Sequence, residues 1–289
     1  MLTARLRPPL PRHPPSLTAP PPPQIWDVLG SRRVRRTYLG HTGALRQVTF
    51  GASGREFLSC SYDKHVRLWD TETGACTGDF VGEKVPYCAT WYPLDANIFL
   101  VGSASRKVLQ YDRRAPAAPV LEYDYHLDAV NTVTFVDEAR RIVTTSDDKK
   151  ILVWEYGAPV PIKYIADPSM YAVPTVTLHP SGEALACQSM DNNVVVYSAG
   201  DRVALNRKKH FSGHVTAGYA CQLAFSPDGR HLASGDGEGQ LWFWDWRSGK
   251  FEKKLRAHAG GPAIGAVWHP LKPSTMATCG WDGLVQLWE

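Results

Sequence analysis

Several features that would indicate a function are scarce in this sequence of 289 residues. It has no run of about 18 apolar residues, the length that a membrane-spanning helix needs, and its N-terminus lacks the apolar core of a secretion signal. No two of its six cysteines stand at the Cys-x-x-Cys spacing of a metal or redox site, which favours buried, reduced thiols. The formal net charge is only +4, too small to indicate a nucleic-acid-binding face by itself. The sequence therefore predicts an intracellular protein without a membrane partner or a cofactor.

Acidic residues are absent from the first 24 residues, which contain nine prolines. Proline removes the amide donors that helices and sheets require, so we expect residues 1–23 to form a disordered tail and residues 24–289 to form the folded domain. The basic, acid-free composition leaves an organelle transit peptide as one alternative. A proline-rich ligand for a partner domain is another.

Aromatic residues are abundant, with 10 tryptophans and 12 tyrosines, and they recur at regular intervals. Strand-like runs end at spacings of 42 to 47 residues on Trp26, Trp69, Tyr111, Trp154, Tyr197, Trp244 and Trp288. Six residues before each of the last six stands a turn residue: Asp63, Ser105, Asp148, Asp191, Glu238 and Asp282. Short strands repeating at this period are typical of the four-stranded blades of a WD-repeat β-propeller. We therefore predict an all-β fold of this type.

The number of blades is less clear, because the first repeat is short. It keeps only "QIWDVL" and "RRVRRTYLG", as if two strands were missing, and six complete units follow. We favour the seven-bladed geometry of the family with an incomplete first blade. The alternative is a six-bladed closure, in which "RVRRTYLG" pairs directly with the C-terminal "LVQLWE".

The repeat resembles WD-repeat proteins generally, and this resemblance implies a structural hydrogen-bond network in each complete blade. In one blade it would join His41, Asp63 and Trp69, and in another it would join His126, Asp148 and Trp154. Ser105 and Glu238 depart from the pattern, so their blades should lack the full network. A catalytic His-Asp pair is the alternative, but a pairing that recurs from blade to blade is typical of scaffold.

Several strings are not general to WD repeats, among them "KVPYC", "YIADPSM", "LACQSMDN", "GHVTAGYACQLAFSPDG" and "TCGWDGL". They resemble the family of second-step splicing factors represented by pre-mRNA-processing factor seventeen. The resemblance implies a nuclear, non-enzymatic WD-repeat scaffold of the spliceosome that supports the second catalytic step of pre-mRNA splicing. It also implies a monomer within a large complex, with spliceosomal proteins as partners, spliceosomal RNA or pre-mRNA as a further partner, and no small-molecule substrate. A substrate receptor of a ubiquitin ligase and a hydrolytic propeller are the alternatives.

Propellers bind partners through the loops at one end, and the repeat register places particular residues there. The partner-binding candidates are Tyr62, Tyr87, Trp281, Arg46, Asn131 and Asp147, with the three aromatics as expected anchors. Alternatively, these side chains merely pack against neighbouring loops. Of the basic clusters "NRKKH" and "SRRVRR", the first offers Arg207, Lys208 and Lys209 as contacts for RNA phosphate. A solvated loop is the alternative for both.

Overall fold

A computed structural model describes residues 22–27, 30–115 and 118–289 of the protein. Every regular element in these ranges is a β-strand, and so this part of the chain contains no helix long and apolar enough to cross a membrane. The strands belong to two compact units. The N-terminal unit consists of the described residues up to 135 together with 139–168, and the C-terminal unit of 136–138 together with 169–289.

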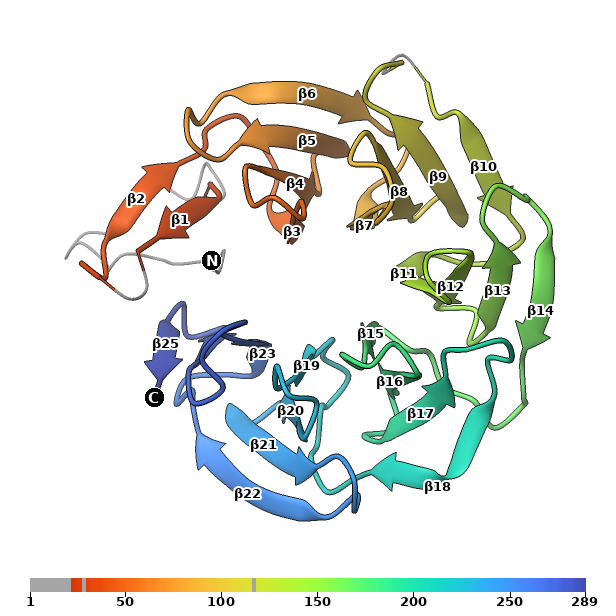
Figure 1. The fold of residues 1–289 in the computed structure, drawn as a ribbon. Helices are drawn as coiled ribbons and strands as arrows, with labels where there is room; N and C mark the ends of the chain where they lie inside the picture. Colours follow the sequence, from red (N-terminus) through yellow and green to blue (C-terminus); the bar gives the residue numbers. More distant parts are fainter. Residues whose placement is uncertain (1–21, 28–29, 116–117) are drawn as a thin grey trace. The chain divides into compact units, whose positions relative to one another are not determined.

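The N-terminal unit contains one two-stranded sheet and three four-stranded sheets (Figure 1). The two-stranded sheet pairs β1 (Gln24–Trp26) with β2 (Val34–Thr37) in antiparallel register. The first four-stranded sheet contains β3 (Leu45–Phe50), β4 (Glu56–Ser61), β5 (His65–Asp70) and β6 (Cys76–Val81). The second contains β7 (Pro86–Trp91), β8 (Ile98–Ser103), β9 (Lys107–Asp112) and β10 (Leu121–Asp124). The third contains β11 (Val130–Val136), β12 (Arg141–Ser146), β13 (Ile151–Glu155) and β14 (Pro161–Ile165).

The C-terminal unit contains two four-stranded sheets and one three-stranded sheet. The first contains β15 (Thr175–Leu178), β16 (Ala184–Gln188), β17 (Val194–Ser198) and β18 (Leu205–Phe211). The second contains β19 (Leu223–Phe225), β20 (His231–Gly235), β21 (Gln240–Asp245) and β22 (Phe251–Arg256). The third contains β23 (Ala263–Trp268), β24 (Met276–Gly280) and β25 (Val285–Trp288).

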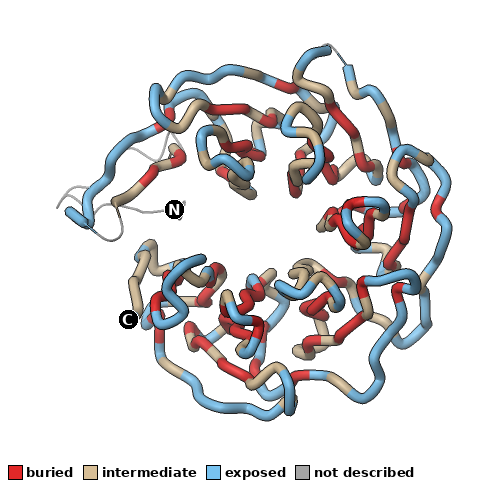
Figure 2. The backbone as a smooth tube through the Cα atoms, viewed as in Figure 1, coloured by how far each residue is buried: buried red, intermediate tan, exposed pale blue. Residues whose placement is uncertain are grey.

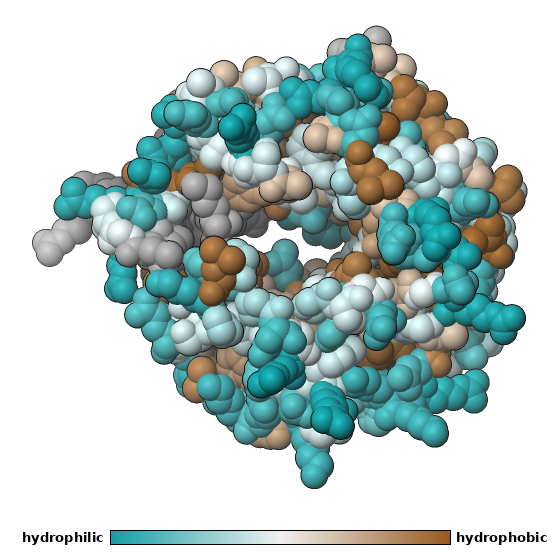
Figure 3. All heavy atoms as spheres, in the orientation of Figure 1, coloured by the Kyte–Doolittle hydropathy of each residue, from teal (hydrophilic) through white to brown (hydrophobic). Residues whose placement is uncertain are grey.

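Burial varies across each four-stranded sheet in the same way. The second and third strands are largely buried, whereas the fourth strand is mostly exposed (Figure 2). Both faces of a second strand such as β4 are covered, which explains why its sequence is a nearly continuous run of apolar and small residues. Outer strands such as β22, with the sequence FEKKLR, are rich in charged residues instead. The face viewed in Figure 3 is mostly hydrophilic, with apolar residues scattered over it.

The two-stranded sheet packs against its neighbour in the N-terminal unit through an aromatic cluster. Ile25 and Tyr38 are buried together with Phe57 and Trp69. The rings of Tyr38 and Phe57 meet edge to face with centroids 4.7 Å apart, and the Tyr38 hydroxyl donates to the carbonyl oxygen of Thr71 at 2.8 Å. The short first repeat is therefore a folded part of the N-terminal unit.

The predicted fold class is confirmed: the chain is an all-β protein built from sheets of the WD-repeat type. Six sheets have the form of blades, which is the number given by the six-bladed alternative. The sheet of β1 and β2 occupies the sequence position of the expected incomplete first blade. Within the described residues β2 pairs only with β1, and β25 only with β24. The disordered tail predicted for residues 1–23 lies almost entirely outside the described residues, and the first strand begins at Gln24.

The cysteines are mostly but not uniformly buried. The thiols of Cys60, Cys88, Cys187 and Cys221 are buried, and that of Cys279 is partly buried. Cys76 is exposed, so the expectation of buried thiols is wrong at this position. The reason is that Cys76 begins β6, the outer strand of its sheet, whereas Cys60, Cys88 and Cys187 lie on inner strands.

Candidate partner-binding surface and its supporting hydrogen-bond networks

The turn between the second and third strands of every blade sheet has one recurring conformation. The residue after the turn position is left-handed in all six, with φ between 62° and 83°, at Lys64, Arg106, Lys149, Asn192, Gly239 and Gly283. In four of these turns the preceding aspartate accepts a hydrogen bond from the amide two residues later, as Asp63 does from His65 at 3.0 Å. Such aspartate turns stabilise the left-handed conformation that follows, which explains why aspartate predominates there.

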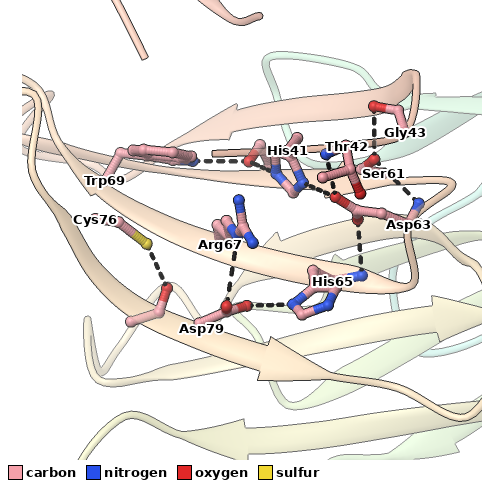
Figure 4. Close-up of polar contacts among 12 residues, drawn as sticks. His41, Thr42, Gly43, Ser61, Asp63, His65, Arg67, Trp69, Cys76 and Asp79 are labelled. Carbon is pink, nitrogen blue, oxygen red and sulfur yellow. Dashed lines mark hydrogen bonds and ion pairs between the residues drawn. The ribbon is translucent and has the colours of Figure 1, made fainter. Parts of the chain in front are cut away.

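In the sheet of β3 to β6, one buried chain of hydrogen bonds connects this turn to the third strand (Figure 4). Trp69 Nε1 donates to Ser59 Oγ at 2.8 Å, and Ser59 Oγ lies 2.6 Å from His41 Nε2. His41 Nδ1 lies 2.8 Å from Asp63 Oδ2, which also accepts the amide of Thr42 at 3.0 Å. This series of hydrogen bonds holds the loop before β3 against β4, β5 and the turn between them.

The partners of His41 determine its tautomer. Because the Asp63 carboxylate can only accept, His41 Nδ1–H donates to it, and the unprotonated Nε2 of the neutral ring accepts from the Ser59 hydroxyl. Burial lowers the pKa of His41, so the ring is neutral at pH 7. Burial alone would raise the pKa of Asp63, but the hydrogen bonds from His41, Thr42 and His65 outweigh it and lower this pKa to about 2. The two side chains are only 2% and 6% exposed, which supports a structural role over acid-base catalysis.

The same arrangement recurs in the sheet of β11 to β14. Trp154 Nε1 donates to Thr144 Oγ1 at 2.9 Å, and this hydroxyl lies 2.8 Å from His126 Nε2. His126 Nδ1 lies 3.0 Å from Asp148 Oδ2. The hydroxyl residue is threonine here and serine in the first network. Sequence reasoning did not name either one.

A third complete network lies in the sheet of β23 to β25, and sequence reasoning did not assign it. His258 Nδ1 lies 3.0 Å from Asp282, and His258 Nε2 lies 3.1 Å from Thr278 Oγ1. Trp288 Nε1 donates to the same hydroxyl at 3.0 Å. Part of the signal was present: Thr278 and Trp288 keep the ten-residue spacing of the first two networks, whereas His258 lies 24 residues before its aspartate and not 22.

The sheets of Ser105 and Glu238 lack the full network, as their sequences led us to expect. In the sheet of β19 to β22 the acid lies two residues earlier: Asp236 accepts the amides of Glu238 and Gln240 and the indole of Trp242 at 2.7–2.9 Å. His214 donates from Nε2 to Gln188 Oε1 of the neighbouring sheet at 2.9 Å instead of binding within its own. The buried Nε1 of Trp244 has no hydrogen-bond partner among the described residues.

Three of the six partner-binding candidates lie together in the N-terminal unit. The guanidinium carbon of Arg46 lies 4.5 Å from the centre of the Tyr87 ring, in a cation–π contact. Its Nη1 lies 3.4 Å from the Tyr62 hydroxyl. Tyr62 is 49% exposed, Arg46 is exposed and Tyr87 is half-buried. We call this group of Arg46, Tyr62 and Tyr87 the aromatic-arginine cluster.

The other three candidates have different surroundings. Asn131 is buried and its Nδ2 donates to Oδ1 of the exposed Asp147 at 2.7 Å, so these two residues form a pair. Trp281, in the C-terminal unit, is 64% exposed and its ring meets that of Tyr219 edge to face at 4.9 Å. Sequence reasoning missed Tyr219, because it lies in the loop before β19, at a position that does not recur from repeat to repeat.

The basic residues Arg207, Lys208 and Lys209 lie on β18, an outer strand of the C-terminal unit, and not on the turns between second and third strands. Of the second basic cluster, Arg36 donates to the carbonyl oxygen of Thr73 at 2.6 Å, which fixes its side chain against the neighbouring sheet. In the part of the chain that the structure describes, no three His, Cys, Asp or Glu side chains are grouped to hold a metal ion.

Comparison with known proteins agrees with this geometry. The family model of the WD domain, G-beta repeat, matches residues 32–70, 117–155, 205–245 and 249–289. Three of these segments contain a complete His-Asp-Trp network. The two unmatched stretches between them contain the repeats that end in tyrosine, at Tyr111 and Tyr197.

Curated relatives include pre-mRNA-processing factor 17 of Homo sapiens, 51% identical over 268 residues that make up 92% of this chain and 46% of that protein. The Saccharomyces cerevisiae protein of the same name is 32% identical over 91% of this chain and 58% of its own length. WD repeat-containing protein 25 of Mus musculus is 26% identical over 92% of this chain and 51% of its own length. The chain thus spans about half the length of the curated relatives it matches.

Solved structures are similar in fold. The β-propeller domain of Cps50 (Swd1) from Myceliophteria thermophila matches with a TM-score of 0.77 at 20% identity, covering 92% of this chain and 88% of that one. A chain of the mitotic checkpoint complex matches with a TM-score of 0.78 at 17% identity, covering 93% and 81%. With four matched repeats and three complete networks, the chain belongs to the WD domain, G-beta repeat family and is similar along nearly its whole length to pre-mRNA-processing factor 17.

Proposed function

We propose that this chain is a non-enzymatic, protein-binding scaffold of the spliceosome that acts in the nucleus and supports the second catalytic step of pre-mRNA splicing. The observation that carries the proposal is its 51% identity to pre-mRNA-processing factor 17 over 92% of the chain. The buried networks also support a scaffold, because their acids and bases are engaged with one another.

The aromatic-arginine cluster is the surface that best fits a protein partner. Arginine and tyrosine are enriched among the residues that dominate binding energy at interfaces. The cation–π contact holds Arg46 against Tyr87, so less conformational entropy is lost when a partner orders this side chain. The exposed Tyr62 hydroxyl and the Arg46 guanidinium then offer donors to the backbone carbonyls or carboxylates of a bound protein.

Trp281 with Tyr219, and Asp147 with Asn131, are the further contact points that we propose. Trp281 offers a large exposed ring, and Tyr219 fixes its position. Asp147 offers a carboxylate held in place by Asn131. We propose that the chain acts as a monomer within the assembled complex and uses these points to contact spliceosomal proteins.

Affinity purification from nuclear extract tests this function. The tagged chain should retain spliceosomal small nuclear RNAs and late-stage splicing proteins, and the triple variant Arg46→Ala, Tyr62→Ala, Tyr87→Ala should retain at least tenfold less. The control is Leu94→Ala with Leu271→Ala, which alters exposed apolar residues elsewhere. Absence of these RNAs and proteins from the wild-type eluate would refute the spliceosomal role. Equal retention by the triple variant and the control would refute the assigned surface.

A further inference from the structure

The outer strand β18 is interrupted by a large bulge. Leu205 lies opposite Tyr197 and His210 lies opposite Val195 on β17, so the four residues 206–209 face the single residue Val196. The Asn206 side chain accepts the amide of Lys208 at 3.1 Å and so stabilises the bulge. Bulges redirect side chains out of the plane of a sheet and are common next to binding sites. This one contains the basic residues 207–209.

In Figure 1, β18 lies next to the turn that joins β21 to β22, in the next sheet of the same unit. A cavity of about 580 Å³ lies between the bulge and this turn. Lys208, Lys209 and His210 line it from β18, and Arg247 lines it from the turn. The volume is within the range of small-ligand sites and is sufficient for one nucleotide. We call this cavity the bulge pocket.

The bulge pocket is electropositive. Its lining includes Lys208, Lys209 and Arg247 and no carboxylate. One acid, Asp245, acts on Lys209: its carboxylate is bound by the amide and the hydroxyl of Ser248 and attracts the Lys209 ammonium group. Three cations against one acid leave an excess of positive charge, which favours an anion such as a phosphate group.

Lys209 is held in a fixed position. Its Nζ lies 3.8 Å from the centre of the Trp246 ring, a cation–π distance. Burial lowers the pKa of Lys209, and attraction by Asp245 opposes this shift. An ammonium group that is partly removed from water gains more from a bound anion than an exposed one does.

Aromatic rings border the same pocket. Phe251 is 49% exposed and rests on Trp242, with ring centres 5.2 Å apart. A supported, exposed ring beside cations is the arrangement with which proteins bind single-stranded nucleic acids, since bases stack on the ring and phosphates lie against the cations. Trp244 forms part of the wall, and its buried Nε1 is without the hydroxyl partner that Trp69 and Trp154 have.

We propose that the bulge pocket binds single-stranded RNA, with a base stacked on Phe251 and the adjoining phosphates at Lys208, Lys209 and Arg247. A phosphorylated peptide would use the cations but would leave the exposed ring without a role. The choice of RNA over DNA rests on the proposed splicing function, whereas the binding of a single-stranded polyanion does not. The aromatic-arginine cluster belongs to the other unit and has no part in this site.

Fluorescence anisotropy with a labelled 12-nucleotide, mixed-sequence RNA tests the pocket in the full chain. Lys208→Gln with Arg247→Gln should weaken binding at least tenfold. It should also make the slope of log K against log salt shallower by about 1.4, since each phosphate contact on a single strand contributes about 0.7. Arg55→Gln with Lys272→Gln removes the same charge from exposed positions elsewhere and should change affinity less than twofold.

The aromatic contribution is tested separately. Phe251→Ala should weaken binding about fivefold or more and leave the salt slope unchanged, and Phe251→Tyr should retain affinity because it retains a stacking ring. Equal losses in the two double variants would overturn the proposal, as would no effect of Phe251→Ala or tighter binding of a phosphoserine peptide than of the RNA. These outcomes are independent of retention in nuclear extract, so failure here leaves the scaffold function standing.

Discussion

His258 and Trp288 hydrogen-bond to one and the same hydroxyl, that of Thr278, at 3.1 and 3.0 Å. The penultimate residue of the chain is thereby connected to the loop before β23 and, through His258, to Asp282. The last strand thus depends on side-chain contacts as well as on its ladder with β24.

Thr278→Val should lower the free energy of unfolding by about 1–3 kcal/mol. The substitution preserves the shape of the side chain but leaves two buried nitrogens without a partner. Thr77→Val, at an exposed position on β6, is the control and should change stability by less than about 0.5 kcal/mol. Chemical denaturation followed by tryptophan fluorescence measures both, and equal losses would contradict a role of the shared hydroxyl.

Asp148→Ala should be similarly destabilising, by about 1–3 kcal/mol, because His126 and the amides of Leu127 and Lys150 lose their acceptor. Ser105→Ala, at the corresponding turn of the sheet of β7 to β10, should cost much less. There the structural contact is made by the amide of residue 105, which donates to the Ser103 hydroxyl at 3.2 Å. Matched melting curves of the two variants provide the comparison, and a shift of the same size in both would argue against the network.

Stability should fall as the pH is lowered from about 6.5 towards 4. Burial lowers the pKa of His214 from 6.5 to about 4, so in this window the unfolded chain binds a proton that the folded chain does not. The full shift corresponds to about 3 kcal/mol. Burial lowers the pKa values of His41 and His126 in the same direction.

The variant His214→Gln tests whether His214 causes this loss of stability at low pH. It should be less stable at pH 7.5 because its contact with Gln188 changes, but its free energy of unfolding should depend less steeply on pH between 6.5 and 4. Urea denaturation at pH 7.5, 5.5 and 4.5 gives the slopes. A slope equal to that of the wild type would show that His214 is not the group responsible.

Amide hydrogens of β25 should exchange faster than those of β13. β25 is an edge strand that pairs with β24 alone within the described residues, and its side chains are only partly buried. β13 is paired on both sides, by β12 and β14, and is almost entirely buried. Hydrogen exchange with mass spectrometry on peptides covering 285–289 and 151–155 measures the difference. Equal protection would show that another segment covers the edge.

The fold was largely predictable because the repeat encodes it redundantly. Within each repeat, the aromatic residue, the turn acid and the apolar run all indicate the same blade. The departures from the consensus at Ser105 and Glu238 therefore did not obscure the repeat. That Asp236, and not Glu238, accepts the hydrogen bonds of this turn was not predictable. It depends on a local rearrangement in which the acid binds the Trp242 indole instead of a histidine. The number of blade sheets was also uncertain, since the short first repeat could be counted in two ways.

The candidate surface was predictable where it follows repeat register and was missed where it does not. Arg46 and Tyr87 occupy equivalent positions at the start of β3 and β7, and Tyr62 lies in the turn between β4 and β5; the structure brings all three within contact distance. The bulge pocket requires three extra residues in β18, where four residues face one, and a bulge of that size has no signature in the hydrophobic pattern. Tyr219 likewise lies in a loop whose path is not set by the repeat.

The contact of His214 with Gln188 joins two sheets that the repeat would otherwise leave as separate modules. The same boundary is crossed where Thr177 Oγ1 donates to the Leu223 carbonyl at 2.9 Å and where His179 Nε2 lies 3.0 Å from the Gly229 carbonyl oxygen. Under a stretching force these side chains must separate before either sheet can be pulled out alone. Pulling the sheet of β15 to β18 away from that of β19 to β22 therefore breaks these three side-chain contacts as well as the apolar packing between the sheets.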